Sequence, residues 1–587
     1  MSYLHFHFLK TIFYQLTQQQ NEMQSSSLHM LDYVVFLFYF VMVAGYGYWI
    51  YNKKKKAETT SADYFLAEGS LTWWAIGASL IASNISAEQM IGMSGNGFIL
   101  GLAISTYEWM AAATLMIVAI FFMPIYLKNH IFTMPQFLKQ RYNDRVAMIM
   151  AVFWLLLYVV VNLTSILYLG ALAVTTISGI NFTVCMIGLS VFAVIITLGG
   201  MKVIGYTDVI QVFFLILGGL ATTYLAINMV SAKFGTTGVF NGLSIMMEKT
   251  PGHFHMIFDK SDKHFMSLPG LTVLIGGMWI TNLNYWGCNQ YITQRALGAD
   301  LPTARNGILF AAFLKLLMPV IVVLPGIAAY VLHQSGDFQT EMLGKDGTLS
   351  QDNAYPVLLN LLAPGLKGLA FAALTAAIVA SLAGKINSIS TIFTLDIYKN
   401  HIKKDATERE LVRIGRYAIW TAMIIGIIIA PFMGIDKKGG FEFIQEYTGF
   451  VSPGVFAMFI FGFFWKRTTS NAAMFAIVGG FLLSIFFKFL PGMMDLSFLN
   501  PMGFSVIDTD ASSPYFGKYA IPFLDRMGFV FIIIVIAMIG LTLADASSKD
   551  TNKGLEIDTS MFKVSNGFAV GALLVLGILM ALYTSFW

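Results

Sequence analysis

The chain has 587 residues, of which 57% are hydrophobic and only 12% are charged, with a net charge of +4. A soluble core stops growing at about 250–300 residues and needs a polar surface, so a soluble protein of this composition is excluded. The apolar blocks extend to about 20 residues, enough for a helix to cross the hydrocarbon layer, whereas barrel strands would alternate over about 10 residues. We therefore predict an all-α polytopic membrane protein.

The amino-terminal residues 1–28 combine a short apolar run with a Gln/Ser-rich stretch. The run lacks a basic start and a small-residue cleavage site, so a secretory signal peptide is not expected, and we predict a mobile tail. Cys185 and Cys288 lie in separate apolar segments, which argues against a disulfide framework or a cysteine metal cluster.

About fourteen apolar spans follow the tail, since each is long enough to cross a bilayer as a helix. Their expected ranges are 29–51, 72–99, 103–127, 146–178, 182–200, 207–231, 270–292, 306–332, 366–398, 412–434, 446–465, 470–490, 527–545 and 565–586.

Basic residues in short loops predict the orientation, because such loops are retained in the cytoplasm. The run 53–56 is four lysines and follows the first span. Alternation from there gives the cytoplasmic loops the residues Lys128, Lys139, Arg141, Arg145, Lys202, Arg295, Arg305, Lys399, Lys403, Lys404, Arg409, Arg413, Arg416, Lys466, Arg467, Lys549, Lys553 and Lys563. This pattern predicts a multi-pass protein of the inner (plasma) membrane with both termini outside.

The second span contains a polar stretch, residues 82–89, with the sequence ASNISAEQ. A regular helix would present some of these groups to lipid, where polar and ionisable residues are costly. A break in the helix explains the stretch better, because freed carbonyls and polar side chains then line an internal site. A polar packing face between helices is the alternative.

Polar residues in other spans favour a polyhydroxylated neutral ligand. Amides and carboxylates hydrogen-bond hydroxyl groups, and an aromatic ring stacks on the apolar face of a sugar. The groups concerned are Glu108 and Trp109, Asn282, Asn284, Tyr285, Trp286, Asn289 and Gln290, Lys315, and Gln445, Glu446 and Tyr447. In the ninth span, Ser381 supplies a hard oxygen suited to an alkali cation, although small residues there also fit an ordinary packing seam.

Four stretches make the chain resemble the solute:sodium symporter family, closest to bacterial sodium/galactose and animal sodium/glucose symporters. They are SADYFLA at 61–67, LIASNISAEQ at 80–89, TDVIQ at 207–211 and QEYTG at 445–449. The resemblance runs from about residue 32 to the carboxyl end. It implies a leucine-transporter-type fold with a 5+5 inverted repeat. The implied units are an extra helix at 29–51, repeats at 72–231 and 270–465, and carboxyl-terminal helices at 466–587.

The resemblance also implies roles for individual residues. The sugar site falls on Asn84, Gln89, Glu108, Asn282, Lys315 and Gln445. The outer gate falls on Met93 and Phe441, and the inner gate on Tyr285 with Trp286 beside it. The sodium site falls on the carbonyls of Ala82, Ile85 and Ala377 and the hydroxyl of Ser381, with Asp208 near the sodium exit route.

Three positions depart from the family pattern. Ala380 stands where one of two paired hydroxyls is usual, which removes a sodium ligand. Ala111 stands at a sugar-site position that is usually Ser in the galactose symporters, which leaves the preferred sugar open. Lys385 lies one turn after Ser381, where its charge would compete with sodium, reach the cytoplasmic surface or pair with Asp208.

The resemblance therefore implies a secondary transporter, not an enzyme, that couples sodium to uptake of a galactose- or glucose-like sugar. Proton coupling, another solute (an inositol, an amino acid or a carboxylate) and a non-transporting sugar sensor are the alternatives. No cofactor and no nucleic acid are expected, and sodium is the expected coupling ion. The other expected partners are the sugar and the lipid bilayer, with the chain a monomer or loose homodimer.

Overall fold

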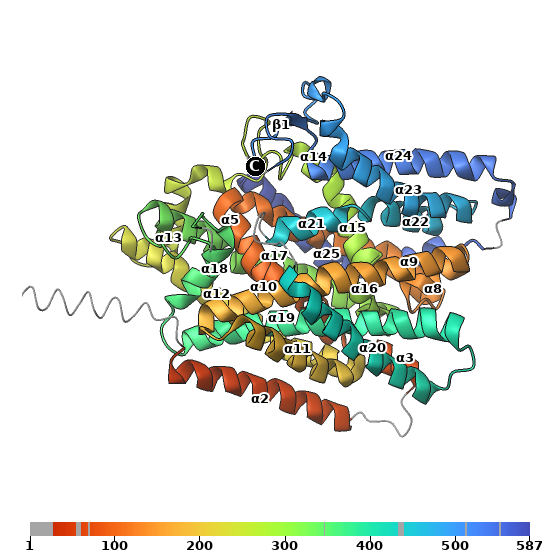
Figure 1. Ribbon diagram of the computed structural model, residues 1–587, viewed down its shortest axis with the longest axis horizontal. Coiled ribbons are helices and arrows are strands. Elements are labelled where there is room, and N and C mark those ends of the chain that lie inside the picture. Colours follow the sequence, from red (N-terminus) through yellow and green to blue (C-terminus); the bar gives the residue numbers. More distant parts are fainter. Residues whose placement is uncertain are drawn as a thin grey trace, which may run out of the picture.

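The computed structural model describes residues 28–53, 60–67, 71–344, 347–432, 440–510, 513–550 and 553–587, so the predicted tail lies outside the described residues except for Leu28. Long helices lie side by side along one direction, horizontal in Figure 1. The named strands of the described part are β1 (Val506–Ile507) and β2 (Tyr519–Ala520), which pair antiparallel. The all-α prediction is confirmed.

The first part of the bundle contains both continuous and interrupted helices. In chain order they are α2 (Met30–Lys53), α3 (Ser61–Leu66), α4 (Trp73–Asn84), η1 (Glu88–Met93), α5 (Ser94–Leu100), η2 (Gly101–Ser105), α6 (Thr106–Ile117), η3 (Val118–Phe122), α7 (Met123–Lys128), α8 (Met134–Arg141), α9 (Asp144–Leu156), η4 (Leu157–Leu163), α10 (Thr164–Ser178), α11 (Phe182–Leu198) and α12 (Gly200–Lys233).

The second part repeats this alternation of broken and continuous helices. Its elements are α13 (Val239–Lys249), η5 (Pro251–Phe254), α14 (Leu271–Ile275), α15 (Gly277–Gly287), α16 (Gln290–Leu297), α17 (Leu301–Gln334), η6 (Gln351–Asn353), α18 (Ala354–Asn360), α19 (Leu366–Thr391), η7 (Ile392–Ile402), α20 (Glu408–Ile429), η8 (Ala430–Phe432), α21 (Gly440–Gly449) and α22 (Ser452–Phe464).

The carboxyl-terminal part comprises α23 (Ser470–Phe489), η10 (Leu490–Gly492), η11 (Ser497–Leu499), α24 (Phe523–Ala544), η12 (Ala546–Lys549), η13 (Thr559–Phe562) and α25 (Asn566–Ser585). It adds helices at more than one place on the bundle, since α25 packs against α17 and α6. Helices α23 and α24 pack against each other.

Within the described residues, ten helical runs are long and apolar enough to span a bilayer, and two shorter ones, α11 and α22, are equally apolar. The predicted count of about fourteen is not reproduced one for one. The span predicted at 270–292 is divided into α14, α15 and α16, and the run Glu88–Lys128 joins parts of two predicted spans through η2. The breaks create this difference, since each leaves helical pieces too short to count alone.

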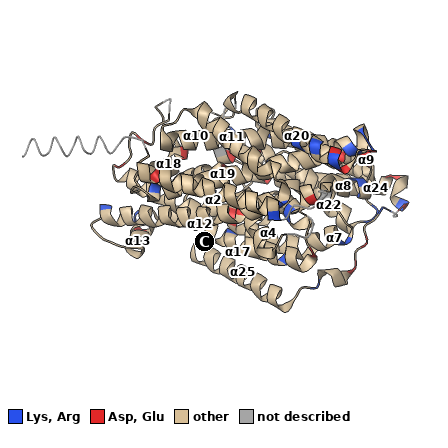
Figure 2. Ribbon diagram, turned by 90° about the horizontal axis from the view of Figure 1, so that it is seen from below, with Lys and Arg blue, Asp and Glu red and all other residues tan. Residues whose placement is uncertain are grey.

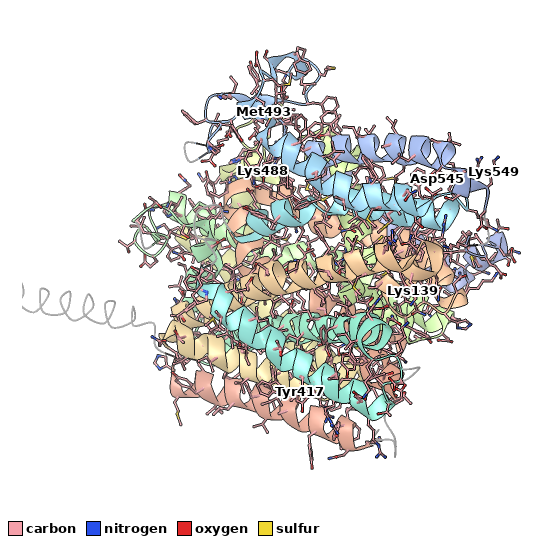
Figure 3. All side chains as sticks on the ribbon, turned by 45° about the vertical axis from the view of Figure 1, so that its right-hand side comes forward. Lys139, Tyr417, Lys488, Met493, Asp545 and Lys549 are labelled. Atoms are coloured by element: carbon pink, nitrogen blue, oxygen red, sulfur yellow. The ribbon has the colours of Figure 1, made fainter. Side chains whose placement is uncertain are left out.

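The outer surface is apolar along these helices, as a bilayer requires. Large hydrophobic side chains are exposed on peripheral helices, among them Ile195 of α11, Ile536 of α24 and Leu573 of α25. Figure 2 shows the charged residues gathered mainly near the helix ends, most densely around α8, α9, α20 and the end of α24. Figure 3 places Lys139, Asp545 and Lys549 toward one end of the bundle, away from Lys488 and Met493. The chain is therefore a multi-pass membrane protein.

Some basic residues expected in loops are buried instead. Arg295 is only 1% exposed, within α16, and Arg141 is 2% exposed. The Arg141 guanidinium donates to the carbonyls of Gly462, Trp465, Lys466 and Thr468 at the end of α22. Because cations at a helix carboxyl end satisfy orphan carbonyls, Arg141 fixes this end of α22.

Helix α2 is attached to the bundle through an acidic residue near its start. Asp32 is fully buried, and its Oδ1 accepts from the backbone N–H groups of Gly365 and Gly368, each at 2.7 Å. These groups lie at the start of α19, where the first N–H groups of a helix have no internal partner. Asp32 therefore caps α19 from another helix.

Candidate functional site

The polar stretch of the second span interrupts the helix, as predicted. Helix α4 ends at Asn84, and Ile85 is extended, with φ −83° and ψ 114°. The Ser86 N–H donates to Gln89 Oε1 (3.3 Å), and the Gln89 N–H donates to the carbonyl of Ser86 (3.2 Å). In a continuous helix these two donors would bond the carbonyls of Ala82 and Ile85. The break therefore releases both carbonyls for another ligand.

A second interruption lies between α15 and α16. Cys288 ends α15, and Asn289 is extended, with φ −104° and ψ 122°. The Tyr126 hydroxyl donates to the carbonyl of Gly287 at 2.6 Å, and Asn289 Oδ1 accepts from the Tyr158 hydroxyl. Helices from the first half of the chain thus satisfy the groups that this break exposes.

Four residues predicted for the sugar and its inner gate form one polar cluster between these breaks. Lys315 of α17 is 1% exposed, and its Nζ donates to Glu108 Oε2 and to Asn84 Oδ1. Asn84 Nδ2 in turn donates to the Tyr285 hydroxyl at 2.9 Å. The Lys315 ammonium also lies 5.1 Å from the ring centroid of Trp286. A buried charge needs such partners, and Glu108 neutralises Lys315 here.

Three other predicted sugar residues make their described hydrogen bonds elsewhere. Gln89 accepts from Ser86 within the break. Asn282 is 5% exposed and donates to the carbonyl of Met278 one turn earlier in α15. Gln445 lies in α21, where its carbonyl accepts from the Thr448 hydroxyl. Among the described hydrogen bonds, none connects these three residues to the cluster around Lys315.

The predicted outer gate is closed over the break. Met93 is fully buried and Phe441 is 2% exposed. A Cβ on Gly92 would lie 2.9 Å from the Phe441 backbone nitrogen, so α21 approaches η1 as closely as a glycine permits. Tyr107 packs edge-on against the Phe441 ring with the centroids 5.1 Å apart. On the other side of the cluster, Tyr285 keeps partial exposure.

The residues predicted for sodium lie where α4 meets α19. Ser381 is 1% exposed, and its hydroxyl donates to the carbonyl of Ser83 at 3.1 Å. This bond places Ser381 beside the end of α4, next to the carbonyls that the break releases from Ala82 and Ile85. Ala377 lies one turn before Ser381 in α19. These groups are hard oxygen donors from two helices, which is the chemistry an alkali cation requires.

Asp208, predicted near the exit route, is fully buried in α12. Its Oδ2 accepts from the Ser79 hydroxyl at 2.5 Å, and Arg295 Nε donates to the same hydroxyl at 2.9 Å. The prediction from sequence missed Arg295 because a lone basic residue after an apolar run resembles a loop charge. It also missed Tyr291, whose hydroxyl donates to that of Tyr285. No single-sequence signal separates these side chains from ordinary interfacial ones.

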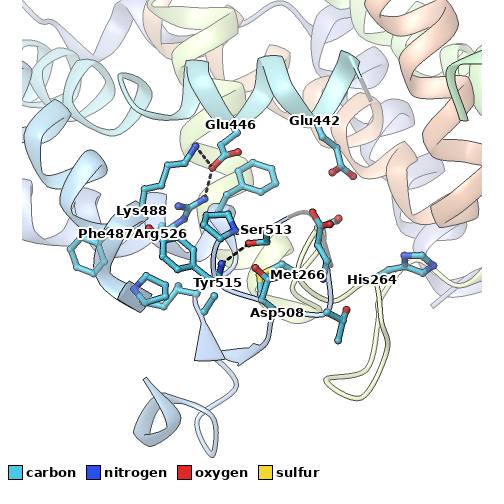
Figure 4. Close-up of a pocket in the computed structure, with 18 of the residues that line it drawn as sticks. His264, Met266, Glu442, Glu446, Phe487, Lys488, Asp508, Ser513, Tyr515 and Arg526 are labelled. Atoms are coloured by element: carbon cyan, nitrogen blue, oxygen red, sulfur yellow. Dashed lines mark hydrogen bonds and ion pairs between the residues drawn. The ribbon is translucent and has the colours of Figure 1, made fainter. Parts of the chain in front are cut away.

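A cavity of about 460 Å³ lies beside α21. Figure 4 shows Glu446 of α21 between Lys488 of α23 and Arg526 of α24. Glu446 Oε1 lies 3.1 Å from Lys488 Nζ and 2.9 Å from Arg526 Nη2. These ion pairs connect α21, whose second residue is Phe441, to α23 and α24.

Within the described ranges, no group of three or more His, Cys, Asp or Glu could hold a metal ion. The arrangement instead offers two adjoining binding chemistries at two helix breaks. One is a cluster of amide, carboxylate, ammonium and aromatic groups, which suits hydroxyl groups on a flat-faced ligand. The other is a set of backbone and hydroxyl oxygens, which suits a small hard cation. Binding at broken helices near the bilayer midplane is typical of secondary transporters.

Comparisons with known proteins agree with this geometry. The model of the sodium:solute symporter family matches residues 64–480. The chain is 45% identical over 569 residues to a sodium/glucose cotransporter of Vibrio parahaemolyticus, covering 95% of this chain and 99% of the relative. It is 32% identical to the human sodium/myo-inositol cotransporter 2, covering 77% and 69%. The substrate-bound, outward-open structure of a Na⁺-coupled sialic acid symporter superposes with a TM-score of 0.70 at 21% identity, covering 88% of this chain and 98% of that one.

Proposed function

Because the chain belongs to the sodium:solute symporter family, whose members are transporters, we propose that the solute it carries with sodium is a sugar. One observation carries the proposal: the buried cluster of Asn84, Glu108 and Lys315 lies between two helix breaks and beside Trp286. Its donors and acceptors match hydroxyl groups, and the charges cancel, so a neutral ligand meets no unpaired charge.

The proposed sugar site extends the cluster to Gln89, Asn282 and Gln445, whose amides complete the shell after small rearrangements. Met93 and Phe441 close the site on the outer side, and Tyr285 with Trp286 closes it on the inner side. The proposed sodium ligands are the carbonyls of Ala82, Ile85 and Ala377 and the hydroxyl of Ser381. Asp208 then lies on the proposed route by which sodium leaves.

Coupled transport is expected because the proposed sodium site and the proposed sugar site share the broken helix. Sodium between α4 and α19 would hold the broken helix in the arrangement that completes the sugar cluster, so each ligand strengthens binding of the other. Rocking of one repeat against the other then opens the inner gate. We propose 72–231 and 270–465 as these repeats. Entry of each sodium ion adds about 2.3 kcal/mol per 100 mV of membrane potential.

We further propose that both termini lie on the outside of an inner membrane. The proposed orientation rests on the basic residues at one end of the bundle, including Lys139 and Lys549 (Figure 3). Protease accessibility of tags at each end, measured in right-side-out vesicles, tests it. Tags that are cleaved only after lysis would contradict the orientation.

The test of the function is uptake of radiolabelled sugars into proteoliposomes with an inward sodium gradient. A panel of galactose, glucose and myo-inositol, each with choline replacing sodium in a parallel sample, identifies both cargo and coupling ion. We expect sodium-dependent uptake of at least one hexose by the wild type and none by the Glu108→Gln variant. Uptake of an amino acid or carboxylate, with no uptake of any polyol, would refute the sugar proposal.

A cyclic polyol is the second candidate, since the chain shares 32% identity with the human sodium/myo-inositol cotransporter 2. Inositol presents a full ring of hydroxyl groups, which the same amide and carboxylate cluster could bind. Competition between unlabelled myo-inositol and labelled hexose in the same panel ranks the two ligands.

A further inference from the structure

A second pair of opposite charges lies at the interface where sodium is expected. Lys385 follows Ser381 by one helical turn in α19 and is only 4% exposed, so it does not reach the membrane surface. Glu88 is the first residue of η1, three positions after Ile85, and is 7% exposed. Among the described residues the two form no direct ion pair, so their charges compensate each other through space, and the Lys385 ammonium lies 4.9 Å from the ring centroid of Tyr291.

Glu88 has no other strong partner within the described part of the chain. Its backbone N–H donates to the Ser86 hydroxyl at 3.2 Å, but its carboxylate Oε1 has no hydrogen-bond partner among the described residues. A carboxylate buried in this way is costly unless an opposite charge compensates it. Lys385 is the cation that interacts with it, so each residue accounts for the burial of the other.

The charges around this interface balance as two pairs. Arg295 lies against α19 at Gly384, where an added Cβ would stand 2.3 Å from Arg295 Nη2. Arg295 interacts electrostatically with Asp208, as Lys385 does with Glu88. The formal charges of these four residues, two positive and two negative, therefore sum to zero. Loss of either carboxylate would leave an excess positive charge beside the sodium ligands.

The pair is also connected to the sugar cluster. The ring that faces Lys385 belongs to Tyr291, whose hydroxyl donates to that of Tyr285. Tyr285 accepts from Asn84, which accepts from Lys315. A continuous series of contacts thus runs from the two charges to the cluster proposed for the sugar, and such contiguity makes energetic coupling testable.

We propose that Glu88 neutralises Lys385 so that sodium can bind beside it, and that this pair sets the sodium affinity of the transporter. The proposal rests on the proposed sodium site. Sodium and the pair bridge the same two helices, since Ile85 and Glu88 flank the break and Ser381 and Lys385 are neighbours on α19. With alanine at position 380, Ser381 supplies the one side-chain hydroxyl among the proposed ligands, so the net charge around the site contributes a larger share of the binding free energy.

The test is a double-mutant cycle in which each charge is removed singly and then together, read by sodium titration. In Glu88→Gln the ammonium is unopposed, and we expect the sodium concentration for half-maximal effect to rise at least tenfold, about 1.4 kcal/mol. In Lys385→Met it should fall, and in the double variant it should return to within about threefold of the wild type, because the net charge is restored. Lys367→Met is the matched control, since it removes a lysine from the same helix fourteen positions before Ser381.

Two readouts separate this proposal from the sugar assignment. Thermal stabilisation of the purified protein by sodium chloride over choline chloride needs no sugar, and sodium-dependent uptake follows in proteoliposomes. A sodium shift in the wild type that Glu88→Gln and Lys385→Met leave unchanged would overturn the pair alone. No sodium shift in the wild type would overturn the sodium site and the proposal with it. If Glu88→Gln does not fold, a Lys385→Met variant that binds sodium no more tightly than the Lys367→Met control overturns it.

Discussion

Gly326 of α17 is where a single methyl group should impair the transporter most clearly. A Cβ there would lie 2.0 Å from the Ser94 carbonyl oxygen and 2.9 Å from the Phe98 nitrogen, both in α5. Ordinary contact begins at 3.4 Å, so Gly326→Ala requires α5 and α17 to separate by about 1.4 Å. These neighbours are backbone atoms, which cannot swing aside as a flexible side chain could.

Separation of the two helices would displace residues of the proposed sugar site. Helix α17 also carries Lys315, and α5 follows the break that positions Asn84. Overpacking of a well-packed interface costs about 1–3 kcal/mol, and a misplacement of about 1 Å at a functional site can cost 10²-fold in rate. We expect sodium-dependent uptake to fall at least tenfold and the melting temperature to decrease.

The assay is initial uptake in proteoliposomes at matched protein density, with melting temperature from intrinsic fluorescence. Gly540→Ala in α24 is the control, because nothing lies within 4 Å of its added Cβ. Alanine is favoured over glycine in a helix by about 1 kcal/mol, so this variant should keep its uptake and its stability. Wild-type uptake and stability in Gly326→Ala would refute the close approach of the two helices as a functional requirement.

Three further predictions concern the polar groups. Glu108→Gln leaves the Lys315 charge uncompensated, at about 3–5 kcal/mol, and should abolish sodium-dependent uptake while the protein still elutes as one peak in size exclusion; uptake at the wild-type rate contradicts the cluster. Ser381→Ala should remove the sodium dependence of uptake, whereas Ala380→Ser should lower the sodium concentration for half-maximal uptake severalfold, as sodium titration would show. Glu446→Gln breaks two partly buried ion pairs of about 0.5–1 kcal/mol each, so the melting temperature should fall slightly with the sugar KM unchanged.

The helix break was predictable because its sequence makes a regular helix untenable. Five of the eight residues from Ala82 to Gln89 are polar, and lipid would penalise them on a continuous helix. The same reasoning located Glu108 and Lys315, since a buried charge in a span requires a partner. The structure shows that these two residues neutralise each other.

Other features depend on contacts that sequence does not encode locally. Arg295 was expected in a loop, yet its burial depends on Ser79 and Asp208, which come from helices far away in the chain. Gln89 was expected to face the sugar, but in this conformation Ser86 engages its amide oxygen within the break. The predicted spans do not correspond one for one to the helices where these are interrupted, because length along the chain does not reveal where a helix stops. The membrane orientation stays a prediction.

The attachment of α2 has a practical consequence for anyone shortening this protein. The helix looks dispensable, since it precedes both proposed repeats and touches the rim of the bundle (Figure 1). Yet its Asp32 accepts hydrogen bonds from the backbone N–H groups at the start of α19, the helix that bears Ser381 and Lys385. Removing α2 would leave the start of α19 uncapped. A truncated variant made for crystallisation should therefore bind its coupling ion more weakly than the full chain does.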